Sequence, residues 1–158
     1  MKRFKRVLVA NRGEIAIRIF RACHELGIRT VAIYSNEDKN SLFRMKADES
    51  YLIGKNKGPI ETYLNIDEII KVAKKKAVDA IHPGYGFLAE NYLFAKACEE
   101  YNINFIGPSS NVLKLMGDKI AADAFVRGLD IAVLNKVICS PAEMRDMEET
   151  LDYPIMVK

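Results

Sequence analysis

Short apolar segments that alternate with amphipathic segments are the feature of this sequence that most limits how the chain can fold. Residues 6–10 (Arg-Val-Leu-Val-Ala) form a short apolar run, which is typical of a strand buried on both faces of a sheet. Residues 15–26 then place apolar side chains three and four positions apart, which predicts a helix that ends at Gly27. Another apolar run follows at residues 30–34. Strand, helix and strand within about thirty residues predict a parallel, right-handed βαβ unit.

The same alternation continues to residue 108 and predicts an α/β fold. Asn65 and Glu68 have the spacing of a capping box at the start of a helix, and Asn91 is suited to cap a later helix. The segment 55–61, which contains glycine and proline, is expected to be a loop. Further strands are expected at 50–53, 78–82 and 104–106, and further helices at 66–76 and 92–101. The pattern predicts a Rossmann-like, doubly wound parallel sheet.

The alternation of strands and helices stops after the fifth predicted strand. Two short helices are expected at 111–116 and 119–127. A Ser-Pro-Ala-Glu sequence at 140–143 predicts the start of a third helix, which would extend to about residue 151. Residues 153–158 have the composition of a strand without a successor, so we expect the chain to be part of a longer protein.

Composition excludes several functional classes. The chain of 158 residues is 49% apolar, which is incompatible with intrinsic disorder, and its formal charge of +3 is too small to indicate a nucleic-acid or membrane-surface partner. The three cysteines, an odd number without close spacing, argue against a disulfide framework and a cysteine-based metal site. No apolar run approaches the roughly 18 residues that span a bilayer. We expect a soluble, cytoplasmic protein without a metal site among its own residues.

The turn between the first strand and the first helix is one candidate binding site. A dinucleotide-binding fold places its phosphate turn there, and Glu37 lies near the distance expected for a ribose-binding acid. Of the three fingerprint glycines only Gly13 is present, and Glu14 would repel a pyrophosphate at the start of the helix. In the structural alternative, Gly13 permits the turn and Glu14 complements the helix dipole.

The loop that begins at His82 is a second candidate, because open α/β sheets bind ligands beyond the carboxyl ends of their strands. Gly84 and Gly86 would let the backbone approach a ligand, and Tyr85 offers a ring and a hydroxyl group. The alternative is a tight turn with a buried Phe87 and a hydrogen-bonded His82.

Charged side chains make up the remaining candidates. Lys119 and Lys158 lie at the ends of predicted elements, where an ammonium group can contact phosphate, although a lysine is more often simply exposed. Arg18, Arg21 and Glu25 share one face of the first predicted helix. That face is either a solvated surface with an Arg21–Glu25 ion pair or a subunit interface.

Several segments of the chain carry a further signal when they are taken together. They are residues 9–16 (VANRGEIA), 82–91 (HPGYGFLAEN), 105–108 (FIGP), 116–119 (MGDK) and 153–158 (YPIMVK). In this order they resemble the amino-terminal part of the biotin carboxylase component of biotin-dependent carboxylases. Within that family, segments 35–38, 47–51 and 58–65 are most similar to pyruvate carboxylases. The biotin carboxylase subunit of acetyl-CoA carboxylase is the alternative.

The resemblance implies an ATP-dependent ligase of the ATP-grasp type. Residues 1–116 would form its Rossmann-like amino-terminal domain, and residues 117–158 would begin the ATP-grasp domain. With ATP and Mg²⁺, the family joins bicarbonate to phosphate and then carboxylates biotin. The other segments that this chemistry needs would lie outside the chain, so we expect no catalytic residue in it and no activity from it alone. A non-catalytic Rossmann-like binding or dimerisation module is the alternative of a different class.

The resemblance also implies roles for individual residues. Lys119 and Lys158 match lysines that contact ATP in the family, and Tyr85 and Gly86 match a loop that borders the biotin pocket. The family forms a homodimer through the helix face that here carries Arg18, Arg21 and Glu25. A biotin carboxyl carrier domain is the other implied partner, and neither nucleic acid nor a membrane is expected.

Overall fold

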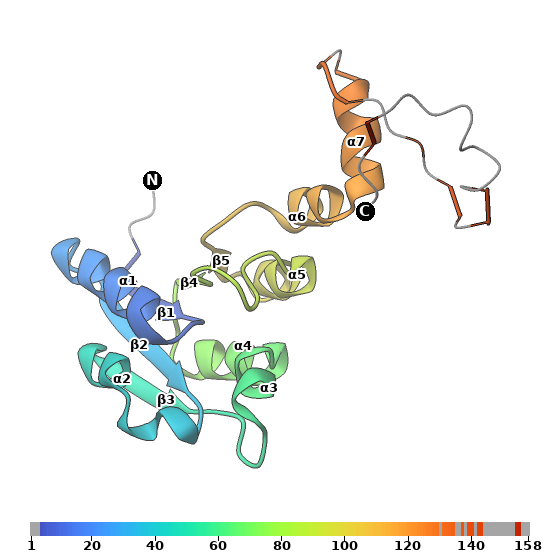
Figure 1. Cartoon of the computed structure of the whole chain (residues 1–158). Coiled ribbons are helices and arrows are strands. Elements are labelled where there is room, and N and C mark those ends of the chain that lie inside the picture. The colour runs from blue at the N-terminus through green and yellow to red at the C-terminus, as the bar shows by residue number, and fades with distance from the viewer. Residues whose placement is uncertain are drawn as a thin grey trace. The chain divides into compact units, whose positions relative to one another are not determined.

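The computed structural model describes residues 4–129, 131–134, 137, 139–140, 142–143 and 154–155. The chain divides into two compact units, Met1–Ala122 and Asp123–Lys158. The first unit contains a parallel five-stranded sheet with the strand order β3-β2-β1-β4-β5 (Figure 1). Its strands are β1 (Arg6–Val9), β2 (Arg29–Tyr34), β3 (Glu49–Leu52), β4 (Ala80–His82) and β5 (Asn104–Phe105).

Helices follow the strands in the alternation that the sequence predicts. The main ones are α1 (Gly13–Glu25), α4 (Ile66–Lys75), α5 (Tyr92–Glu100), α6 (Ser110–Gly117) and α7 (Lys119–Arg127). Shorter elements are the 3₁₀ turn η1 (Glu37–Asn40), α2 (Leu42–Lys46) and α3 (Pro59–Tyr63). The predicted α/β fold with a doubly wound parallel sheet is confirmed.

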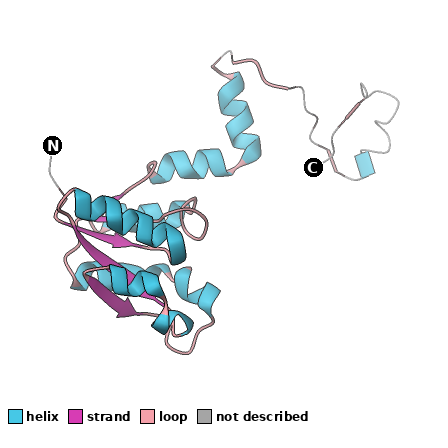
Figure 2. Cartoon of the chain, turned by 60° about the vertical axis from the view of Figure 1, so that its left-hand side comes forward, coloured by secondary structure: helices cyan, strands magenta, loops and turns pink. Residues whose placement is uncertain are grey.

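Both faces of the sheet are covered by helices (Figure 2). In β1 and directly after it, Val7 and Val9 face a core cluster formed with α1 and α2, whereas Leu8 and Ala10 face a cluster formed with α3, α4 and α5. All four side chains are at most 1% exposed. This two-sided burial explains why β1 is a continuous apolar run rather than an alternating one.

The helix ends form as their local sequences predict. Gly27 has φ +68°, its N–H donates to the His24 carbonyl at 3.0 Å, and the Ile28 N–H donates to the Cys23 carbonyl at 2.8 Å. These are the two hydrogen bonds of a Schellman motif, which ends α1. At the start of α5, the Asn91 side chain accepts hydrogen bonds from two backbone N–H groups, as predicted.

Two local predictions need correction. The segment 55–61 is not all loop, because α3 begins at Pro59, where the proline ring favours the first helical position. Asn65 caps α4 as predicted by accepting from the Glu68 N–H at 3.2 Å. The Glu68 carboxylate, however, accepts from the Asn65 side chain at 3.0 Å and from the Gly54 N–H at 2.7 Å. It therefore ties α4 to the end of β3 instead of closing a capping box.

In the second unit, the predicted cap at residues 140–143 forms. The Glu143 carboxylate accepts from the Ser140 N–H at 2.6 Å, and the Ser140 hydroxyl accepts from the Glu143 N–H at 3.3 Å. The rest of the helix expected up to residue 151 and the candidate Lys158 lie outside the described residues. Of the strand expected at 153–158, only Pro154 and Ile155 are described, and neither is in a strand. Within the described part of the chain, no helix has the length and apolar character needed to cross a membrane.

Candidate functional site

The two candidate loops of the sequence meet beside β1. This strand pairs with β2 on one side and with β4 on the other, and Val9 lies opposite His82. The winding of the chain reverses between β1 and β4, and open α/β folds bind ligands at the carboxyl ends of strands at such a point. The turn after β1 and the loop after β4 therefore form one site rather than two.

Asn11 joins the turn after β1 to the loop after β4. Its side-chain nitrogen donates to the carbonyl oxygens of Pro83 and Tyr85, both at 2.8 Å, and its oxygen accepts from the Arg12 N–H at 2.9 Å. The residue is 3% exposed. Gly84 lies against it with φ +69°, and a Cβ there would stand 2.6 Å from the Asn11 nitrogen. Only glycine fits this close approach.

A second contact holds the other end of the loop. The Phe87 ring packs against the fully buried Tyr63 ring with their centroids 5.3 Å apart. The Tyr63 hydroxyl donates to Asp38 at 2.7 Å and accepts from the Ser35 N–H at 3.2 Å. Phe87 is itself 38% exposed, so the expectation that it is buried is wrong: one side of its ring packs on Tyr63 while part of it remains in solvent.

Asp38, the acceptor of the Tyr63 hydroxyl, also forms an ion pair with Arg12. The Arg12 Nε and Nη2 atoms donate to the two carboxylate oxygens at 2.6 and 2.5 Å, and the Ser41 hydroxyl donates at 2.8 Å. The hydrogen bond from Arg12 is the main cause that lowers the pKa of Asp38 to about 2. Burial, together with this carboxylate, raises the pKa of Tyr63 above its ordinary value.

The residues around this ion pair test the hypothesis that the turn after β1 binds a dinucleotide. The sequence directs attention to Glu37 as the acid after β2, but Glu37 is exposed and its neighbour Asp38 turns inward. The carboxylate of Glu14 stands in the first turn of α1, where a pyrophosphate would otherwise bind. Gly13 has φ +62°, as the structural alternative requires. The geometry therefore supports the structural interpretation of this turn.

Tyr85 and Gly86, the two residues of the loop predicted to border a ligand, are both exposed. Tyr85 is 61% exposed, and its hydroxyl donates to Glu14 at 3.1 Å, which raises the pKa of the phenol. Gly86 has φ +65° and no heavy atom within 4 Å of the position of a Cβ, so its backbone is open to a ligand. His82 is hydrogen-bonded as expected, because its Nδ1 accepts from the Gly84 N–H at 3.0 Å, and burial lowers its pKa.

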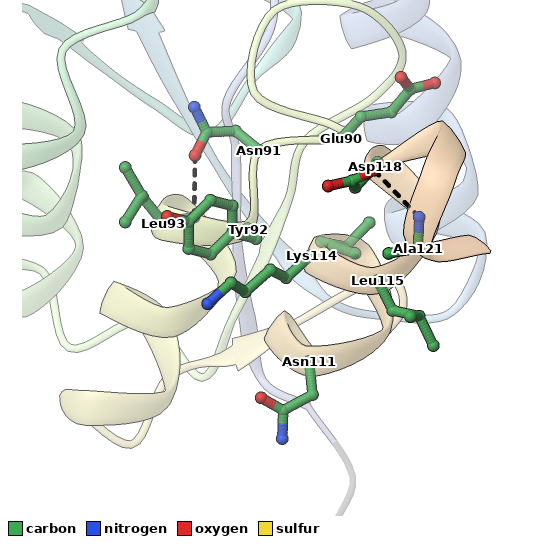
Figure 3. A pocket seen from close by; sticks show the side chains of 11 residues that line it. Glu90, Asn91, Tyr92, Leu93, Asn111, Lys114, Leu115, Asp118 and Ala121 are labelled. Carbon is green, nitrogen blue, oxygen red and sulfur yellow. Dashed lines mark hydrogen bonds between the residues drawn. The ribbon is translucent and has the colours of Figure 1, made fainter. Parts of the chain in front are cut away.

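A hollow of about 680 Å³ lies next to the end of this loop (Figure 3). Its lining includes Glu90, Leu93, Lys114, Asp118 and Ala121. The Lys114 ammonium lies 5.7 Å from the centre of the Tyr92 ring. Lys119 itself does not line the hollow, although residues on both sides of it do. The structure thus places the beginning of α7, where Lys119 lies, next to the end of the His82–Asn91 loop.

The exposed face of α1 contains the predicted ion pair. The Arg21 Nε donates to the Glu25 carboxylate at 3.0 Å, and the two side chains are 82% and 66% exposed. Arg18 is exposed as well. The i,i+4 pair is therefore confirmed, while the use of this face as a subunit interface stays a prediction.

Metal and thiol chemistry have no support in the part of the chain that the structure describes. No group of three or more histidine, cysteine, aspartate or glutamate side chains there could hold a metal ion. Cys23, Cys98 and Cys139 are free thiols. Burial raises the pKa of Cys98 to about 12 and also raises that of Cys23, so neither is poised as a thiolate nucleophile.

Comparisons with known proteins identify the family to which this site belongs. The family model for the biotin carboxylase N-terminal domain matches residues 3–113. The chain belongs to this family. A pyruvate carboxylase of Staphylococcus aureus is 55% identical over 161 residues, which cover 100% of this chain and 14% of that protein. A biotin carboxylase of Halalkalibacterium halodurans is 50% identical over 159 residues, which cover 98% of this chain and 35% of that protein.

Solved structures of biotin carboxylase domains have the same fold. The biotin carboxylase domain dimer of the Hydrogenobacter thermophilus 2-oxoglutarate carboxylase, in complex with MgADP and bicarbonate, matches with a TM-score of 0.88 and 44% identity. The match covers 98% of this chain and 34% of that one. The resemblance found in the sequence is confirmed, and the chain spans only a minor part of the length of these biotin carboxylase relatives.

Sequence reasoning missed three residues of the site: Asn11, Asp38 and Tyr63. A usable signal existed for one of them. Arg12 follows β1 and Asp38 follows β2, so opposite charges stand beyond the carboxyl ends of two adjacent parallel strands. Nothing local in the sequence marks Asn11 or Tyr63, because their partners lie 72 and 25 positions away.

Proposed function

We propose that this chain is the amino-terminal part of a biotin carboxylase component that uses ATP and bicarbonate to carboxylate biotin, with pyruvate as the final acceptor. The observation that carries the proposal is the match of residues 3–113 to the biotin carboxylase N-terminal domain. The 55% identity to a pyruvate carboxylase over the whole chain supports pyruvate as the acceptor. Oxaloacetate would be the product, and the biotin would be attached to a carrier domain.

Residues of this chain would lie at the edge of such a site. Tyr85 and Gly86 would border the biotin pocket, because they offer an exposed hydroxyl group and an unobstructed backbone beyond the strand ends. Lys119, at the start of α7, and Lys158 would contact the phosphates of ATP. Bound ATP and Mg²⁺ would supply the phosphoryl group that activates bicarbonate. Residues from 117 onward would begin the ATP-grasp domain, whereas residues 1–116 would form the Rossmann-like domain.

The family suggests the assembly, and the cysteines bear on the compartment. We propose a homodimer through the α1 face of Arg18, Arg21 and Glu25, whose side chains are exposed in the single chain. The dimeric biotin carboxylase domain of the Hydrogenobacter thermophilus protein supports this assembly. The three free thiols agree with a reducing, cytoplasmic location.

The experiment that tests the function uses the full-length gene product. Its ATP cleavage should depend on bicarbonate and rise with biotin, and labelled bicarbonate should enter oxaloacetate when pyruvate is supplied. The 158-residue chain alone should show neither activity. A full-length product without bicarbonate-dependent ATP cleavage would overturn the proposal and favour a non-catalytic binding or dimerisation module.

Acetyl-CoA is the second candidate acceptor. The 50% identity to a biotin carboxylase is close to the 55% identity to a pyruvate carboxylase, so the identities alone separate the two acceptors poorly. Label that enters malonyl-CoA and not oxaloacetate would assign the chain to an acetyl-CoA carboxylase. The biotin-dependent ATP cleavage would be the same in both cases.

A further inference from the structure

We propose that Asn11 is the residue that positions the Tyr85–Gly86 loop for biotin, a role that rests on the proposed function of that loop. Both hydrogen bonds that the Asn11 amide donates go to backbone carbonyls, so it would act through the backbone of the loop. Its amide nitrogen donates to the carbonyl oxygens of Pro83 and Tyr85, both at 2.8 Å. It is 3% exposed, so water does not compete for these bonds.

The loop needs such a contact because its own backbone is strained. Gly84, Gly86 and Phe87 have φ values of +69°, +65° and +39°, and the last is unfavourable for a side chain with a Cβ. The carbonyls of Pro83 and Tyr85 point to one place, where their dipoles would repel each other without a donor between them. The two hydrogens of a single amide nitrogen satisfy both.

The geometry is specific for asparagine opposite glycine. Aspartate would present a third acceptor to the two carbonyls, and alanine would leave both without a donor. A Cβ on Gly84 would stand 2.6 Å from the Asn11 nitrogen and displace it. The Gly84 N–H donates to His82 Nδ1 at 3.0 Å. Both the carbonyl and the N–H of the Pro83–Gly84 peptide are therefore hydrogen-bonded. A loop fixed before the ligand arrives binds it without the cost of ordering.

Hydrogen exchange in the 158-residue chain tests the contact without reference to activity. Asn11→Ala should accelerate exchange of the Gly84 and Ala89 amides about tenfold, as expected for the loss of two neutral hydrogen bonds, while the amides of β2 keep their rates. Asn104→Ala is the matched control, because the Asn104 amide also donates to a backbone carbonyl, that of Asp79, at 3.0 Å. Unchanged loop amides in the Asn11 variant would overturn the inference.

Kinetics of the full-length product test the positioning role. The protein is prepared without its attached biotin, so that free biotin is the substrate. Asn11→Ala should raise the KM for free biotin about tenfold, in proportion to the lost population of the competent loop, and leave the KM for ATP within about twofold. Gly84→Ala should act in the same way from the opposite side of the contact. Asn104→Ala should change neither constant.

The double variant separates positioning from general damage. Both single substitutions break the same contact. The fold-rise in the KM for biotin of the Asn11→Ala/Gly84→Ala protein should therefore be well below the product of the two single fold-rises. Fully multiplicative effects, or equal rises in the KM for biotin and for ATP, would overturn the inference. If the full-length protein without substitutions does not carboxylate biotin at all, the proposed function fails. Hydrogen exchange in the 158-residue chain still decides whether Asn11 holds the loop.

Discussion

Replacing the buried carboxylate of Asp38 by an amide should destabilise the first unit by about 2 kcal/mol. Arg12 lowers the pKa of this carboxyl from 3.8 to about 2. A pKa lowered by this much corresponds to roughly 2 kcal/mol of preference for the ionised form in the folded state. The larger cost of breaking a fully buried ion pair does not apply, because the Arg12 side chain is 47% exposed and can be solvated.

Urea denaturation of the wild-type chain and of the Asp38→Asn variant measures this difference. At neutral pH the midpoint should fall while the slope with urea stays the same. Because the folded-state pKa is depressed, the stabilisation by Asp38 is present above its unfolded pKa near 4 and is lost as the pH falls through about 2. The difference between the two proteins should therefore shrink between about pH 4 and pH 2.

Glu100→Gln is the matched control, since it also converts a carboxylate to an amide within an ion pair. Its partner Lys96 lies 3.9 Å away, and both side chains are more than half exposed, so we expect a change of less than about 0.5 kcal/mol. Two results would refute the reasoning about Asp38. One is a loss as small as that of the control, and the other is a difference from wild type that does not change between pH 7 and pH 2.

Three further experiments test other contacts. Tyr63→Phe should cost about 1–2 kcal/mol in the same assay, because it leaves the buried Ser35 N–H without its acceptor; an unchanged midpoint would contradict this. Gly54→Ala should lower the free energy of unfolding at least twice as much as Gly13→Ala does. Both glycines have positive φ, but only at Gly54 would the new methyl group lie 2.0 Å from a buried threonine side chain. Equal midpoints of the two variants would show that backbone strain alone decides. Arg21→Glu should convert the proposed dimer of the full-length product to monomers in sedimentation velocity, whereas a dimer that persists would place the interface elsewhere.

The order of strands and helices could be predicted from sequence because each element has a local cause. The run at β1 is apolar throughout since both faces of the strand are buried, and α1 ends where Gly27 can adopt a positive φ. α3 was missed because five residues around Gly58 and Pro59 show the composition of a turn as much as that of a short helix. The family also followed from sequence, because its motifs occur in order along the chain.

The sequence by itself determined the order of the strands and of the main helices, the family, and the loop that offers Tyr85 and Gly86. Only the tertiary structure decided how that loop is held. It placed Asn11 against Gly84, and it turned Asp38 inward instead of Glu37. The physical reason is that a loop conformation depends on which strands are adjacent, here β1 and β4, and strand adjacency is set by packing between residues that are far apart in the chain.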